Sequence, residues 1–221
     1  DTLTIPWTDR NKITKVLLRT CKPTITSVND RFLYAMYKLN EVDISGLCNV
    51  TTLGLTFIGG IARKDGQDFD AGFTLLKKVD LSPLSNVLTI AGDFMYNCTG
   101  LESIDISPLY NIPDLGSYFL QRCIKITEVN FSNMVNITDI DRRFMHCCTN
   151  LLRVDLSQAK KLLASNAIKP GFVQDCPNLT EVNLGTIKSA VFANDRSLAT
   201  TDKPDFNFAL WTQFTTDPTS T

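Results

Sequence analysis

A repeat with a period of 25 residues constrains the fold of this 221-residue chain more than any other feature. Segments that begin at Phe94, Phe119 and Phe144 share one pattern: a Cys lies four residues after the Phe, a Leu or Ile lies three residues later, and a short alternation of apolar and polar residues follows. A fixed period of this length is typical of stacked-repeat proteins, in which each unit packs only on its neighbours. The sequence therefore predicts a solenoid.

Weaker copies extend the repeat in both directions, which predicts repeats over residues 13–187. The interval from Phe32 to Phe69 is 37 residues, and the surplus lies in a polar, Gly-rich stretch. We therefore predict an insertion loop at 59–72 that projects from the stack. Solenoids need capped ends, so residues 1–12 and the aromatic-rich segment 188–214 are predicted as N-terminal and C-terminal caps. Residues 215–221 form a Thr-rich polar tail.

The alternation at the end of each unit predicts one short parallel strand per turn. These strands are expected to form one sheet on the concave face of a curved coil, with loops and short helical turns on the convex face. Tyr118 to Cys123 carries no helix breaker and is expected to form one such turn. The seven predicted strands lie near residues 15–18, 41–45, 78–82, 103–107, 128–132, 153–157 and 181–184.

Four of the seven cysteines, Cys98, Cys123, Cys148 and Cys176, lie four residues after a Phe. Stacking would place them in one column, where reduced thiols pack as small apolar side chains. The other three cysteines lie outside this column and could be free or paired; they are Cys21, Cys48 and Cys147.

The unit made by Leu101, Ile104, Ile106, Ile112, Leu115-Gly116, Phe119 and Cys123 resembles the leucine-rich repeats of the BspA-like type. This resemblance implies an α/β fold, a leucine-rich-repeat solenoid with a right-handed coil. It also implies a role, because proteins of this type in bacteria and protozoa are often surface-exposed or secreted and bind host or matrix proteins.

Composition and motifs give little support to other functions. With 22 basic and 23 acidic side chains the chain has no bulk attraction for nucleic acid. No apolar run is long enough to span a bilayer, and the first ten residues do not resemble a signal peptide. His146 is the only histidine, and no Cys-x-x-Cys, phosphate-binding Gly loop or Gly-x-Ser-x-Gly motif occurs. We therefore predict no catalytic residue, no cofactor and no metal.

Two polar columns on the predicted strands are the candidate binding surface. They are either solvated residues that maintain solubility or a hydrogen-bonding groove for a protein partner, because the concave surfaces of solenoids are extended binding surfaces. The stacked carboxylates are expected to repel one another. The predicted partner-binding residues are Glu41, Asp43, Lys78, Asp80, Asp105, Glu128, Asn130, Arg153, Asp155, Glu181 and Asn183.

Five Asn-x-Ser/Thr sequons are present, of which Asn97 and Asn178 are predicted on outer turns as glycosylation sites. The sequons at Asn49 and Asn136 share the phase of Asn86 and Asn111, which predicts a structural column of Asn side chains bound to backbone turns. Together these features predict a non-enzymatic, protein-binding module at a cell surface or secreted, with a role in adhesion or ligand recognition. The alternative is a cytoplasmic leucine-rich-repeat scaffold or ubiquitin-ligase-type adaptor.

Overall fold

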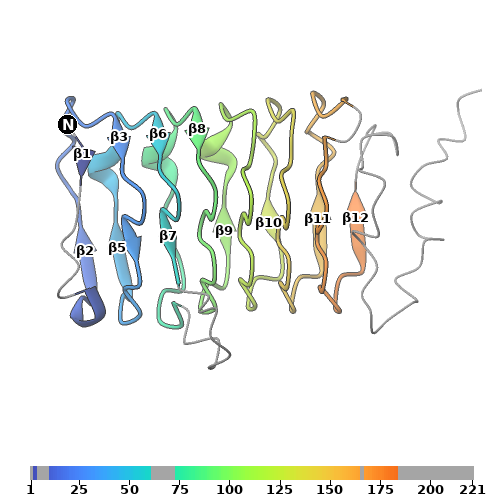
Figure 1. Cartoon of the computed structure of the whole chain (residues 1–221), viewed down its shortest axis with the longest axis horizontal. Coiled ribbons are helices and arrows are strands. Elements are labelled where there is room, and N and C mark those ends of the chain that lie inside the picture. Colours follow the sequence, from blue (N-terminus) through green and yellow to red (C-terminus); the bar gives the residue numbers. More distant parts are fainter. Residues whose placement is uncertain (1, 4–9, 61–72, 165–166, 184–221) are drawn as a thin grey trace, which may run out of the picture.

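The computed structural model describes residues 2–3, 10–60, 73–164 and 167–183. Successive coils of the chain lie side by side in one row, from β2 at one end to β12 at the other (Figure 1). This arrangement confirms the predicted solenoid. Helical residues in the described ranges are confined to four short 3-10 helices: η1 (Arg10–Lys12), η2 (Ser45–Leu47), η3 (Ser82–Leu84) and η4 (Ser107–Leu109).

All strand pairs of the described coils are parallel, as expected when each coil repeats the path of the one before. The strands are two or three residues long: β1 (Thr2–Leu3), β2 (Lys15–Leu17), β3 (Ser27–Val28), β4 (Leu33–Tyr34), β5 (Glu41–Asp43), β6 (Thr52–Leu53), β7 (Ile58–Gly59), β8 (Thr89–Ile90), β9 (Ile104–Asp105), β10 (Val129–Asn130), β11 (Arg153–Asp155) and β12 (Glu181–Asn183).

Six of the seven predicted strands are present, but they are shorter than predicted and do not form one sheet. They form the separate pairs β2–β5, β9–β10 and β11–β12. The stretch 78–82 is not a strand, because the backbone bond from Glu102 N to Lys77 O is isolated and η3 begins at Ser82. A second sheet, with the order β1-β3-β6-β8, runs along another side of the coils. Its strands are only two residues long and carry no readable alternation, so the sequence did not predict it.

The predicted helical turn from Tyr118 to Cys123 is wrong. The φ angles of Tyr118, Leu120 and Arg122 are 61°, 53° and 60°, so every second residue is left-handed. A left-handed residue other than Gly costs about 1–2 kcal/mol and interrupts a right-handed helix. Hydrogen bonds between coils offset this cost, such as the 2.9 Å bond from Leu120 N to Phe94 O.

A stack of six Phe rings forms the centre of the core. The rings are buried and nearly parallel, with interplanar angles of 7–14° and centroid distances of 5.0–6.0 Å between neighbours. Contacts of this kind add to the stabilisation from apolar burial. The stack runs through Phe32, Phe57, Phe94, Phe119, Phe144 and Phe172.

Phe57, and not Phe69, follows Phe32 in this stack, which moves the predicted insertion. Gly59 pairs with Tyr34 in the β4–β7 ladder, and Gly60 N donates to Tyr96 O at 2.9 Å. Both glycines are buried within the coil, so the surplus residues begin after Gly60. The rest of the predicted loop, 61–72, lies outside the described residues.

The cysteine column is confirmed as a ladder of buried, reduced thiols. Three of them contact the preceding coil: Cys123 Sγ lies 3.2 Å from Met95 O, Cys148 Sγ 3.2 Å from Leu120 O, and Cys176 Sγ 3.2 Å from Met145 O. Burial raises the thiol pKa throughout the column, to about 12 for Cys176.

Three of the four predicted members of the Asn column bond to backbone turns, whereas the amide of Asn49 lies against the sulfur atoms of Cys21 and Cys48. The side-chain amides of Asn86, Asn111 and Asn136 donate to backbone carbonyls of the preceding coil, namely those of Cys48, Ser85 and Tyr110, at 2.8–3.1 Å. These bonds satisfy turn carbonyls that the short ladders leave unpaired.

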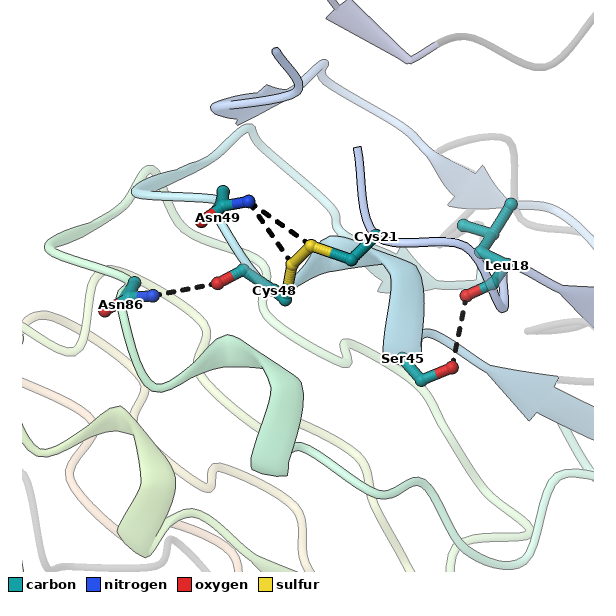
Figure 2. The surroundings of a disulfide bond; sticks show 6 residues. All are labelled: Leu18, Cys21, Ser45, Cys48, Asn49 and Asn86. Carbon is teal, nitrogen blue, oxygen red and sulfur yellow. Dashed lines mark hydrogen bonds between the residues drawn. A yellow bond between two sulfur atoms is a disulfide. The ribbon is translucent and has the colours of Figure 1, made fainter. Parts of the chain in front are cut away.

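A disulfide joins Cys21 and Cys48, which settles a pairing that the sequence left open. Figure 2 shows that Asn49 lies beside it, with its Nδ2 at 3.2 Å and 3.3 Å from the two sulfur atoms. The bond ties the coil that contains β2 to the coil that contains β5. A covalent link of this kind is found mainly in proteins that fold in an oxidising compartment.

Candidate functional site

The strands β2, β5, β9, β10, β11 and β12 carry the predicted polar columns, except for Lys78 and Asp80, which lie in the coil that has no strand at this position. We call the surface that these coils form the strand face. Ile104, Val129 and Val154 point from it into the core and are buried. The alternating positions point outward, and each predicted residue on this face is exposed or partly exposed. The registers Asp105↔Asn130 and Asp155↔Asn183 place residues of the same column side by side.

The polar ladder, defined as Asp43, Asp80, Asp105, Asn130, Asp155 and Asn183, has a structural role that the sequence analysis missed. In five of these six residues, Oδ1 accepts a hydrogen bond of 2.8–3.0 Å from the backbone N–H two residues later, always that of a Ser. This Asx turn ends the strand and starts the next turn. The recurrent Asp/Asn-x-Ser spacing is the sequence signal for it.

The expected repulsion along the ladder is partly removed by its asparagines. Asn130 Nδ2 donates to Asp105 Oδ1 at 3.1 Å, and Asn183 Nδ2 donates to Asp155 Oδ2 at 3.2 Å. Partial burial raises the pKa of Asp155, but hydrogen bonds from Ser157 and Asn183 outweigh it, so the pKa of this carboxyl is below its usual value. Asp155 is therefore a stable anion on this face.

The second column contains ion pairs between coils. Lys15 pairs with Glu41 across β2 and β5. Arg153 bonds to Asp155 at 3.0 Å and to Glu181 at 3.2 Å, so one guanidinium joins the two columns. All of these side chains are substantially exposed, where such pairs contribute at most about 1 kcal/mol each. Their charges remain available to a partner.

Four predicted residues line one shallow depression in the strand face: Glu128, Asn130, Arg153 and Asp155. Its volume is about 470 Å³, and Ser103, Ser132 and Ser157 complete its polar rim. The depression is open and lined by hydrogen-bonding groups of both charges. It can receive a polar side chain or loop of a partner. The other predicted residues lie along the strand face outside the depression.

The two predicted glycosylation sites differ. Asn97 is only 2% exposed, so the prediction of an accessible acceptor there is wrong. It lies in the tight turn after Phe94, with a φ of 58°, and its N–H donates to Gln121 O. Asn178 is exposed, although its Nδ2 donates to Thr149 O at 2.8 Å. Glycosylation at Asn178 stays a prediction.

His146, the only histidine of the chain, lies in a polar cluster. Its Nε2 lies 2.9 Å from Asp175 Oδ2, and its Nδ1 lies 2.8 Å from Gln121 Nε2. Cys147 Sγ lies 3.4 Å from Nε2. Aligning 146–147 with 174–175 in adjacent repeats would have identified the cluster.

This cluster is poorly arranged for nucleophilic catalysis. Both ring nitrogens of His146 already have partners, so neither is directed at the thiol as a general base. Burial and the charge of Asp175 raise the pKa of the Cys147 thiol, whereas a reactive cysteine needs a lowered one. Burial also lowers the pKa of His146, against the opposing hydrogen bond of Asp175.

Comparisons with solved structures find similar proteins at low sequence identity. A leucine rich cell surface protein from Faecalibacterium prausnitzii A2-165 is 15% identical, with a TM-score of 0.36, over 98% of this chain and 63% of that chain. The functional domain of InlJ from Listeria monocytogenes, described as including a cysteine ladder, is 14% identical, with a TM-score of 0.25, over 79% of this chain and 42% of that chain. The chain thus spans less than two thirds of either protein. No curated protein matches the sequence significantly.

In the described part of the chain, no helix has the length and apolar character needed to cross a membrane. The sequence pattern of one family, described as the BspA type Leucine rich repeat region, matches residues 71–201 in six copies. Those residues contain the cysteine column, four of the six stacked Phe rings and most of the polar ladder. The chain therefore belongs to the BspA-type leucine-rich-repeat family.

Proposed function

We propose that this chain is a non-enzymatic module, at a cell surface or secreted, that binds a protein partner through its strand face. The observation that carries the proposal is the depression lined by Glu128, Asn130, Arg153 and Asp155. It lies on the strand face, where polar side chains of both charges repeat from coil to coil. Surfaces of this kind favour a polar, charge-complementary protein partner.

The disulfide supports the extracellular form of this proposal. Cys21–Cys48 suits an oxidising compartment, whereas the cytosol keeps thiols reduced. The free thiols of the column do not favour a cytoplasmic scaffold, because their burial protects them from oxidation in either compartment. The surface module is therefore preferred over the intracellular adaptor.

Binding can be tested with purified matrix proteins and with host cells as immobilised partners. Arg153→Glu reverses the one positive charge that lines the depression and should reduce affinity at least tenfold if a complementary contact is made there. The double variant Asp105→Asn, Asp155→Asn should also weaken binding, because it keeps the Asx turns and removes two charges. Glu102→Gln, on an exposed ion pair with Lys77, is the matched control. Unchanged affinity in both Arg153→Glu and the double variant would place the site elsewhere on the chain.

The compartment has a separate test. Intact mass of the protein from its native source is measured before and after glycosidase treatment, and without reduction. A loss of mass that disappears in Asn178→Gln, together with five titratable thiols, is the expected result for a secreted protein. Seven titratable thiols and no change in mass would favour the intracellular scaffold.

A further inference from the structure

The turn that follows each stacked Phe brings chemically different side chains from three consecutive coils together. Gln121 lies two residues after Phe119, His146 and Cys147 lie two and three residues after Phe144, and Asp175 lies three residues after Phe172. His146 Nε2, Cys147 Sγ and Asp175 Oδ2 all lie within 4.8 Å of one another. These side chains are partly buried, in a part of the coil separate from the strand face.

We propose that His146, Cys147 and Asp175 bind one divalent transition-metal ion of the zinc class. Imidazole nitrogen, thiolate sulfur and carboxylate oxygen are the three donor types that Zn²⁺ takes in proteins. Around a tetrahedral zinc ion, pairs of such donor atoms are about 3.3–3.6 Å apart. The distances here are 3.4 Å from Nε2 to Sγ, 2.9 Å from Nε2 to Oδ2 and 4.0 Å from Sγ to Oδ2. Small side-chain movements bring all three to one ion.

Gln121 provides an independent reason to place a metal there. Its side chain is buried, with 4% exposure, and points at His146. The Nε2 atom of Gln121 lies 2.8 Å from Nδ1 of His146. Its Oε1 is buried without a hydrogen-bond partner. If the amide turns over, Gln121 Oε1 accepts a hydrogen bond from the Nδ1–H of His146. The lone pair of His146 Nε2 then becomes free for a metal. Metal-bound histidines usually donate their second N–H to such an oxygen.

Cys147 is the suitable thiol among the described free cysteines. The others are buried in the column, whereas Cys147 is half exposed. Its sulfur lies 3.6 Å from Nδ1 as well as 3.4 Å from Nε2, so it sits beside the imidazole ring. Binding of one ion at the point where His146 Nε2 and Asp175 meet requires this sulfur to turn toward that side of the ring.

The charges of the site balance. A thiolate and a carboxylate offset the two positive charges of the ion, so the nearby guanidinium groups of Arg122 and Arg143 face a neutral group. Three protein ligands leave one position of a tetrahedral ion for water or for a side chain of a partner. Zinc sites with an open position likewise have three protein ligands.

Titration with Co²⁺ tests the proposal. The protein is metal-free, with its disulfide intact and its free cysteines reduced. We expect a thiolate-to-cobalt charge-transfer band and intense d–d bands that saturate at one equivalent and are displaced by Zn²⁺. Cys147→Ser should abolish the charge-transfer band, and His146→Gln should abolish saturable binding. Gln121→Ala should weaken binding about 10–100-fold, as is usual when a group that orients a ligand is lost.

Glu102→Gln, which removes a carboxylate on another coil, is the control and should bind like the wild type. Zn²⁺ should also raise the midpoint of thermal unfolding of the wild type and of Glu102→Gln, but not of His146→Gln, because only a native site links binding to stability. Binding weaker than millimolar, or binding that survives unchanged in both His146→Gln and Cys147→Ser, would overturn the proposal.

Discussion

The first coils of the solenoid and the later ones fill the same positions with different chemistry. One such position lies three residues before the inward-facing Leu or Ile of a unit. It is occupied by Met36 in the region 10–60, by Phe73 in the next coil, and by a cysteine of the column in each coil after that. The early coils are instead joined covalently, through Cys21–Cys48. The period thus prescribes that the side chain is apolar and points into the core. Whether the position carries a titratable group or a covalent link varies between regions.

Alkaline pH should separate the two regions most strongly. An unfolded thiol ionises near pH 8.5, whereas burial keeps the thiols of Cys98, Cys123, Cys148 and Cys176 protonated well above this pH. The stability that these protonated thiols contribute to the folded state is complete below pH 8.5. It is lost as the pH rises toward the pKa values of the folded state. Four such groups give a slope of about 5 kcal/mol per pH unit above pH 9.

Urea unfolding monitored between pH 8 and 10.5 measures this slope. Replacing two of the four column cysteines by Ala lowers stability at pH 7 through lost packing, but it should halve the alkaline slope. An unchanged slope in that variant would show that the column does not cause the loss.

Both regions share the Phe stack, so truncating a ring should cost the same in each. Phe119→Ala and Phe57→Ala each remove a fully buried ring that contacts two neighbours at 5.0–6.0 Å. We expect each to lower the free energy of unfolding by about 3–5 kcal/mol, measured by denaturant titration at pH 7. A negligible loss for Phe57→Ala would contradict its place in the stack.

Removing the disulfide should weaken only the early coils. Its two cysteines are 27 residues apart, and closing a loop of this length restricts the unfolded chain by about 3.5 kcal/mol. The double variant Cys21→Ser, Cys48→Ser should lose stability of this order, with faster amide exchange in residues 10–60 than in 73–183. Cys147→Ser, in the absence of added metal, is the control and should change little.

The period, the inward apolar residues, the cysteine column and the Asn column were all readable from the sequence, because each recurs at a fixed offset from Phe. Features at positions that do not recur in every repeat, and backbone conformations that local preference opposes, were not. To predict that Cys21 pairs with Cys48, or that Asp175 approaches His146, one must know the register between coils and the path of the turns. The left-handed residues at Tyr118, Leu120 and Arg122 were missed because hydrogen bonds between coils impose them against local preference.

The smallest effect concerns the polar ladder, where a structural and a binding role share one side chain. Asp105 Oδ1 holds the Ser107 N–H at 2.9 Å and also accepts from Asn130 Nδ2. Asp105→Ala removes the acceptor of both bonds on an exposed turn and should cost about 1 kcal/mol. Asp105→Asn keeps an oxygen there and should cost close to nothing. Thermal unfolding of the two variants measures the structural role of Asp105. Their affinity for a partner measures its binding role. Equal stability of the two variants would mean that the turn does not depend on this oxygen, so the ladder would then be maintained for binding alone.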